Sequence, residues 1–142
     1  MSVGEILGVH HVKMPVRDMA RSRAWYEQVL GFEPFKEWPD DEGIVRGVSY
    51  RAMGGLSLAL REHADAATGI TGFDPLAMML RGKDDIDHWA ARLDELGVPH
   101  SVPLQIPIGW MMWFDDPDGL QLRFYTLDEH GADPEGRVYG AP

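Results

Sequence analysis

Cysteine is absent from the 142 residues of this chain. Disulfide bridges, thiolate zinc sites and a cysteine nucleophile are therefore excluded. The N-terminus also lacks a basic region followed by an apolar run, and no stretch approaches the roughly 18 apolar residues that a membrane span needs. The last two absences predict a cytoplasmic protein without a membrane partner.

Basic residues are fewer than acidic ones: the chain has 13 lysines and arginines and 23 aspartates and glutamates, which gives a net charge of −10. A surface of this sign repels phosphate backbones, so nucleic acid is not an expected partner. The hydrophobic share of 44% and the charged share of 25% are ordinary for a globular protein, and the length suits one domain. We therefore expect one globular domain over residues 1–142.

Two stretches of the chain repeat the same order of signals. Asp18 and Asp84 each stand at an expected helix start, and a glycine ends each expected helix. The sequence GLSLAL at residues 55–60 also returns as GLQLRF at residues 119–124. Two copies are too few for a stacked array, so the repeat predicts two modules of one architecture with a pocket between them.

Each module has the pattern of a β-α-β-β-β unit. Residues 10–16 alternate in polarity as a half-buried strand does, and Asp18 caps the helix that follows. Residues 62–74 are interpreted as a connection without an element, and residues 127–142 as a loosely held tail. The first module spans about residues 8–62, with a helix at 19–30 and further strands at 32–38, 44–52 and 56–61. The second spans about residues 75–126, with a helix from Asp84 to Gly97 and strands at 76–81, 101–105, 110–114 and 120–126.

The opening of the first module, HHVKMPVRDMARSRAWYEQVLGF, and the close of the second, FDDPDGLQLRFY, resemble the vicinal oxygen chelate superfamily of glyoxalases, bleomycin resistance proteins and extradiol dioxygenases. The resemblance covers roughly Gly8 to Thr126. It implies an α+β fold in which two β-α-β-β-β modules form curled mixed sheets around a cup, with the helices on the outer faces. In metal-using members, His or Glu ligands on four strands face into the cup.

Carried over by position, the family's four metal ligands fall on His11, on Ala59, on Pro75 or Ala77, and on Arg123. Only His11 has a ligand atom. A divalent ion normally needs three protein ligands, and a cation beside an arginine is disfavoured. The resemblance thus predicts neither a metal nor another cofactor. The alternative is a displaced site built from His11 with Glu62, His63 or Asp115.

The remaining histidines do not rebuild the family site. His10 and His11 are expected on opposite faces of the strand, so that they cannot chelate jointly. His88, His100 and His130 are interpreted as exposed or helix-face residues.

The strand alternation predicts a cup lined by cationic and hydrogen-bonding groups, which suits a carboxylate, an enolate or a phenolate. The lining then comprises His11, Lys13, Ser57, Ala59, Arg61, Gln121, Arg123 and Tyr125. In the alternative, Lys13 and Arg61 lie at the rim and pair with carboxylates, as does Arg123. The run 110–114 must turn a large side chain to both faces, and we place Trp110 and Met112 among the ligand-binding residues. Trp38, Met111, Trp113 and Phe114 are further candidates for apolar walls, or else core or dimer contacts.

Three functions remain open at this stage. The first is a metal-free protein of the bleomycin-resistance type that binds a small anionic or aromatic molecule without changing it. The second is an enzyme of lyase, isomerase, cyclase or dioxygenase type, with His11 as general base and Arg123 holding an oxyanion, or with a displaced metal. The third is an interaction module with a vestigial cup. A homodimer is expected, because each module leaves a sheet edge open.

Overall fold

The computed structural model describes residues 3–107 and 109–126. The chain divides into two compact units, Met1–Gly69 and Ile70–Pro142. The tail expected at residues 127–142, with His130, lies outside the described residues. No helix within the described ranges is long and apolar enough to cross a membrane.

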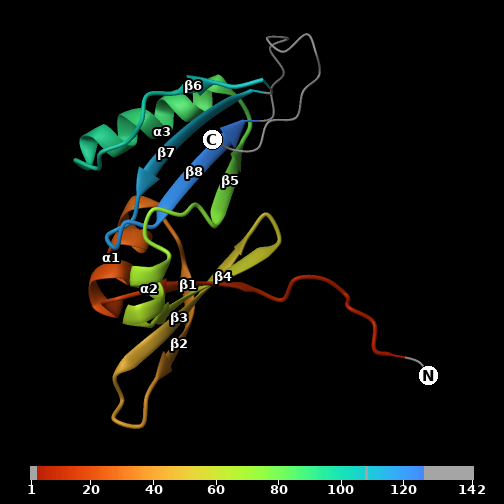
Figure 1. The fold of residues 1–142 in the computed structure, drawn as a ribbon, viewed down its shortest axis with the longest axis vertical. Helices are drawn as coiled ribbons and strands as arrows, with labels where there is room; N and C mark the ends of the chain where they lie inside the picture. The colour runs from red at the N-terminus through yellow and green to blue at the C-terminus, as the bar shows by residue number, and fades with distance from the viewer. Residues whose placement is uncertain (1–2, 108, 127–142) are drawn as a thin grey trace. The chain divides into compact units, whose positions relative to one another are not determined.

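The first unit contains a four-stranded mixed sheet in the order β1-β4-β3-β2, in which β1 runs parallel to β4 and the other neighbours are antiparallel (Figure 1). Its elements are β1 (Val12–Val16), α1 (Met19–Val29), β2 (Pro34–Pro39), β3 (Val45–Met53), β4 (Leu56–Glu62) and α2 (Ala64–Gly69). The Asp18 side chain caps α1 by accepting a hydrogen bond from the Arg21 backbone N–H at 3.0 Å. Gly31, with a φ of 71°, ends the turn after the helix.

One face of the first sheet packs on α1, and the opposite face is called the open face of the first sheet below. Tyr26 of α1 is fully buried and its hydroxyl lies 4.0 Å from the Met14 sulfur on β1. On the same side, Arg23 of α1 pairs with Glu37 of β2. Since neighbouring residues of a strand point to opposite faces, the side chains next to Met14 and Glu37 in sequence belong to the open face.

The second unit repeats this topology, with the strand order β5-β8-β7-β6 and β5 parallel to β8. Its elements are β5 (Leu76–Leu80), α3 (Lys83–Glu95), β6 (Leu104–Gln105), β7 (Trp110–Asp115) and β8 (Gln121–Thr126). Helix α3 lies along β7 and β8 (Figure 1), and its Trp89 ring contacts Phe124 at a centroid distance of 4.9 Å. Two units of this kind confirm the predicted α+β fold class.

Four local predictions are wrong. Residues 64–69 form α2, because residues 62–74 carry enough alanine for a short helix. Helix α3 begins one residue before Asp84, and its N-cap is Gly82, which has no capping side chain. The strand expected at residues 101–105 is reduced to Leu104–Gln105, although the Ser101 N–H still donates to the Trp113 carbonyl at 2.9 Å. The strand expected from residue 10 begins at Val12.

Candidate functional site

The open face of the first sheet brings together four of the five residues predicted there. Lys13 lies beside Ala59 across the β1–β4 pair, and Arg61 lies two residues further along β4. Ser57 precedes Ala59 by two residues on the same face of β4. His11 comes before the start of β1, so it lies at the end of this row rather than within the sheet.

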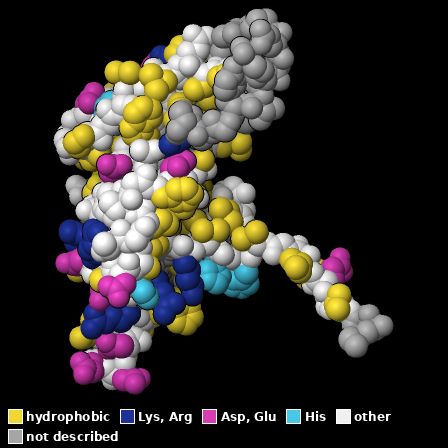
Figure 2. Space-filling model, viewed as in Figure 1, with side chains coloured by type: hydrophobic (Ala, Val, Ile, Leu, Met, Phe, Trp, Pro, Cys, Tyr) yellow, Lys and Arg dark blue, Asp and Glu magenta, His cyan; other side chains and the backbone are white. Residues whose placement is uncertain are grey.

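His10 and His11 contact each other, which overturns the prediction that they point to opposite faces. Their Nδ1 atoms are 2.7 Å apart and their rings meet edge to face with centroids separated by 5.0 Å. The prediction failed because the two-residue alternation applies only to extended strand, and residues 10 and 11 precede β1. In Figure 2, basic side chains adjoin the histidines near the start of β1.

Strand β2 adds an aromatic and a cation to the open face of the first sheet. Trp38 is opposite Gly47, and Lys36 is opposite Ser49. The Trp38 indole N–H donates to the Ser49 hydroxyl at 2.9 Å, while the Lys36 ammonium lies 4.9 Å from the indole centroid. The Trp38 ring therefore leans across β3 and remains 53% exposed.

Lys13 and Arg61 form no ion pair with any residue in the described parts of the chain, and the only charged or aromatic contact of Lys36 there is with Trp38. The alternative in which Lys13 and Arg61 pair with carboxylates therefore receives no support from residues 3–107 and 109–126. An uncompensated cation on a sheet face favours an anionic group from solution. The sequence reasoning missed Lys36 and Ser49, although the alternation of Lys36 and Trp38 along one strand was a usable signal.

Arg123, unlike Lys13 and Arg61, has a carboxylate partner within the described residues. It lies on the face of β8 away from α3 and is only 7% exposed. Its Nε atom lies 3.2 Å from Oδ2 of Asp74 and donates to Oε1 of Gln121 at 2.8 Å, and its Nη1 atom donates to the Tyr125 hydroxyl at 3.2 Å. Gln121, Arg123 and Tyr125, which were all predicted to bind a ligand, are thus joined by hydrogen bonds. The contact with Asp74 agrees with the alternative in which Arg123 pairs with a carboxylate.

Trp110 and Met112 do not lie on the face that carries Arg123, so the structure does not bring these two predicted residues together with it. The register pairs Met111 with Tyr125 and Trp113 with Arg123, so the odd-numbered residues of β7 share the face of Arg123. Trp110 instead lies against the first residue of α3, with the Lys83 ammonium 5.0 Å from its ring centroid. Met112 is fully buried on the α3 side of the sheet.

The family's metal-ligand positions do not fit a metal ion. Ala59 and Ala77 offer no donor atom, and Arg123 is cationic and already paired with Asp74. Across residues 3–107 and 109–126, no group of three or more His, Cys, Asp or Glu side chains is arranged to hold an ion. The predicted absence of a metal stays a prediction.

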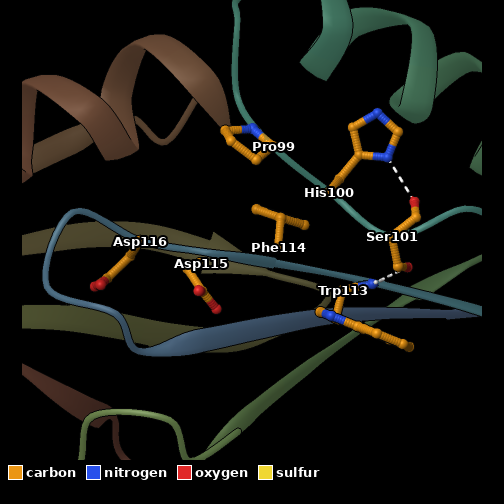
Figure 3. Close-up of a pocket in the computed structure, with 7 residues that line it drawn as sticks. All are labelled: Pro99, His100, Ser101, Trp113, Phe114, Asp115 and Asp116. Carbon is orange, nitrogen blue, oxygen red and sulfur yellow. Dashed lines mark hydrogen bonds between the residues drawn. The ribbon is translucent and has the colours of Figure 1, made fainter.

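A cavity of about 420 Å³ lies at the edge of β7 in the second unit (Figure 3). It is lined by Pro99, His100, Ser101, Trp113, Phe114, Asp115 and Asp116. Figure 3 shows Trp113 and Asp115 projecting from the same side of β7, with Phe114 on the other side. This placement agrees with the strand register.

His100 connects the end of α3 to the segment beside β7. Its side chain is 12% exposed; Nε2 lies 2.8 Å from Oδ1 of Asp94, and Nδ1 lies 2.6 Å from the Ser101 carbonyl oxygen. Burial alone would lower the pKa of His100, but the hydrogen bonds to Ser101 and Asp94 outweigh it and raise the pKa above its usual 6.5. The expectation of an exposed or helix-face residue missed this bridging role.

Raising the pH is expected to weaken the fold through His100. A raised pKa means that the imidazolium stabilises the folded state below pH 6.5, and that this contribution disappears as the pH rises through the pKa of the folded state. The stability advantage of the wild type over His100→Gln should therefore shrink between pH 6 and pH 8.5, by about 0.2–1 kcal/mol for a pair with an exposed partner. Urea unfolding of both proteins at several pH values measures it, and an advantage that grows with pH would contradict the assignment.

Comparison with known proteins assigns the class. Residues 8–124 match the family described as Glyoxalase/Bleomycin resistance protein/Dioxygenase superfamily, and the chain belongs to that superfamily. This confirms the resemblance read from the sequence. The comparison with curated proteins found no match.

Solved structures of the same fold include a glyoxylase/bleomycin resistance protein/dioxygenase domain from Frankia sp. EAN1pec, at 26% identity and a TM-score of 0.70, with 91% of this chain and 96% of that chain covered. TnmS3, an antibiotic binding protein from Streptomyces sp. CB03234, has the same identity and TM-score, with 87% and 100% covered. The fosfomycin resistance protein FosX from Listeria monocytogenes, at 17% identity and a TM-score of 0.69 with 86% and 94% covered, shares the fold alone.

Proposed function

We propose that this protein binds a small anionic or aromatic molecule on the open face of its first sheet without using the family metal. The main observation behind this proposal is that Lys13 and Arg61 have no carboxylate partner among the described residues, while Trp38 presents a half-exposed ring on the same face. A carboxylate or phenolate would accept hydrogen bonds from these cations, and an aromatic body would pack on the indole.

Two further features support a binding role. The strands between the aromatic and the cations carry Gly47, Ser49 and Ala59, and the missing side chain at Gly47 lets the Trp38 ring lie close over β3, where its outer face can meet a flat ligand. TnmS3, which is 26% identical over most of both chains, is an antibiotic binding protein. Likeness at this level supports ligand binding as a class and leaves the ligand open.

Removing the unpaired cations is expected to weaken binding of an aromatic acid. A hydrogen bond to a charged group contributes about 1.5–3 kcal/mol, so Arg61→Gln should raise the Kd of a benzoate or phenolate ligand by roughly 10- to 100-fold, with a similar direction for Lys13→Gln. Tryptophan fluorescence measures the affinity over a panel of aryl carboxylates and phenols, and Trp38→Phe should abolish the signal.

The matched control is Arg21→Gln, which removes the same charge from the exposed side of α1, on the other face of the sheet. Its Kd should stay within a factor of two or so of the wild-type value, since surface charges separated by more than about 10 Å are screened in buffer. Equal weakening by Arg21→Gln and Arg61→Gln would show a general charge effect and would refute a specific site.

A second candidate is an enzyme with His11 as general base, favoured by the 2.7 Å contact between the Nδ1 atoms of His10 and His11. At that distance the Nδ1–H of one ring donates a hydrogen bond to the Nδ1 of the other; in the tautomer in which His11 is the donor, its Nε2 is left to accept a proton from a substrate. Turnover of a supplied thioester adduct or enolisable acid that disappears with His11→Ala, but survives Trp38→Phe, would favour catalysis over binding alone. A homodimer and a cytoplasmic location remain predictions.

A further inference from the structure

The cavity beside β7 has the size of a ligand site, since such sites measure about 300–1,000 Å³ and this one about 420 Å³. Most of its polar atoms already have partners. Both nitrogens of His100 are engaged by Asp94 and Ser101, and the Ser101 hydroxyl donates to the Val102 carbonyl and accepts from the Trp113 backbone N–H. Oδ1 of Asp116 accepts from the backbone N–H groups of the turn that follows.

Two side chains in the lining have polar groups without a partner among the described residues. The exposed Asp115 carboxylate and the Trp113 indole N–H have no hydrogen-bond or ion-pair partner there. They stand two residues apart on the same face of β7, which places their Cβ atoms about 6.5–7 Å from each other (Figure 3). One small molecule can therefore touch both.

The charge of the lining is negative. Asp115 and Asp116 contribute carboxylates, no lysine or arginine lines the cavity, and the charge of His100 is offset by its ion pair with Asp94. An anion is disfavoured here, and one uncommitted carboxylate is too few for a metal ion. An organic cation has the required sign.

We propose that this cavity binds a planar organic cation of the amidinium or guanidinium class. Such a group presents two parallel N–H donors that match the two oxygens of the Asp115 carboxylate. Its flat, weakly hydrated face suits the Trp113 indole, over which a cation gains electrostatic attraction. A tetrahedral ammonium group carries the same charge, but it has neither the two parallel N–H donors nor the flat face. The site uses residues of the second unit alone, so it is independent of the function proposed for the first sheet.

Benzamidine is the test ligand, with benzamide as its neutral isostere and benzylamine as its non-planar cation. Calorimetric titration of the full-length chain should give saturable binding in the order benzamidine, benzylamine, benzamide, with benzamidine at least tenfold tighter than benzamide. Asp115→Asn should weaken benzamidine at least tenfold. Glu95→Gln, which removes one charge from an exposed position on α3 outside the cavity, should leave the Kd within about twofold, since only screened surface charge is lost.

The indole N–H resonance of Trp113, assigned by its loss in Trp113→Phe, gives a second readout, and it should shift with benzamidine in the wild type and in Glu95→Gln. Equal affinity for benzamide and benzamidine would overturn the proposal, because charge would play no part. Equal weakening by Asp115→Asn and Glu95→Gln, or an unmoved Trp113 resonance at saturating benzamidine, would also overturn it.

Discussion

Arg123→Ala is expected to lower the free energy of unfolding by about 2–4 kcal/mol, somewhat below the range for breaking a fully buried pair, because the Asp74 side chain is 27% exposed. The substitution leaves Asp74 without its cation and removes hydrogen bonds to Gln121 and Tyr125. Arg123→Lys should recover only part of the loss, since a point charge cannot serve three partners as the planar fork does. Urea unfolding of each variant measures the effect.

The double variant Arg123→Met with Asp74→Asn provides the control. It removes both charges while keeping apolar volume, so it should be less destabilised than the sum of its single variants, with a coupling of about 0.5–3 kcal/mol. If Arg123→Ala unfolds like the wild type but loses affinity for an aryl carboxylate, Arg123 is a ligand residue as the sequence suggested, and the structural role of the pair is rejected.

Met112→Ala is expected to cost about 2–5 kcal/mol of stability, the range for truncating a fully buried methionine. Met112 lies opposite Phe124 in the sheet and faces α3, so the loss opens a void in the core of the second unit. Met79→Ala is the matched control, because Met79 is 69% exposed on β5 and its truncation should change stability by less than about 0.5 kcal/mol. Thermal and urea unfolding compare the two.

The opposite result would support the ligand-binding role that the sequence predicted for Met112. A Met112→Ala protein with wild-type stability and weakened binding of an aromatic ligand would mean that this side chain contacts the ligand. If Met112→Ala lowers both binding and the melting temperature, the loss of binding reflects the weakened fold and does not show that this side chain contacts the ligand.

The sequence predicted the fold well because its signals are local. The alternation around Met14 and the Asp18 cap each act within a few residues, and both are found as expected. Helix α2 was missed because six residues give too weak a periodic signal. Asp84 was assigned as the cap because its type suits one, yet the backbone leaves the helix at Gly82.

The site was less predictable, since it depends on which residues pair across strands. Counting back from the Asp116–Gly119 turn would have paired Asp115 with Gln121 and placed Trp113, rather than Met112, beside Arg123. The partnership of Arg123 with Asp74 joins a strand to a distant loop, and no spacing rule in a single sequence reveals it. The contact of His10 with His11 depends on where β1 begins, to within one residue.

The missing side chain at Gly47 has a consequence for the binding role proposed for the first sheet. A Cβ atom at this position would come within 3.3 Å of the Trp38 Cβ, closer than most such contacts, and within 3.5 Å of its Cδ1, an ordinary van der Waals distance. One added carbon would thus lift the indole away from β3 and strain its hydrogen bond to Ser49. Position 47 thus sets how closely the Trp38 ring lies over β3, and under the proposed binding role the smallest possible change there would alter the thickness of ligand that fits, with every charge left in place.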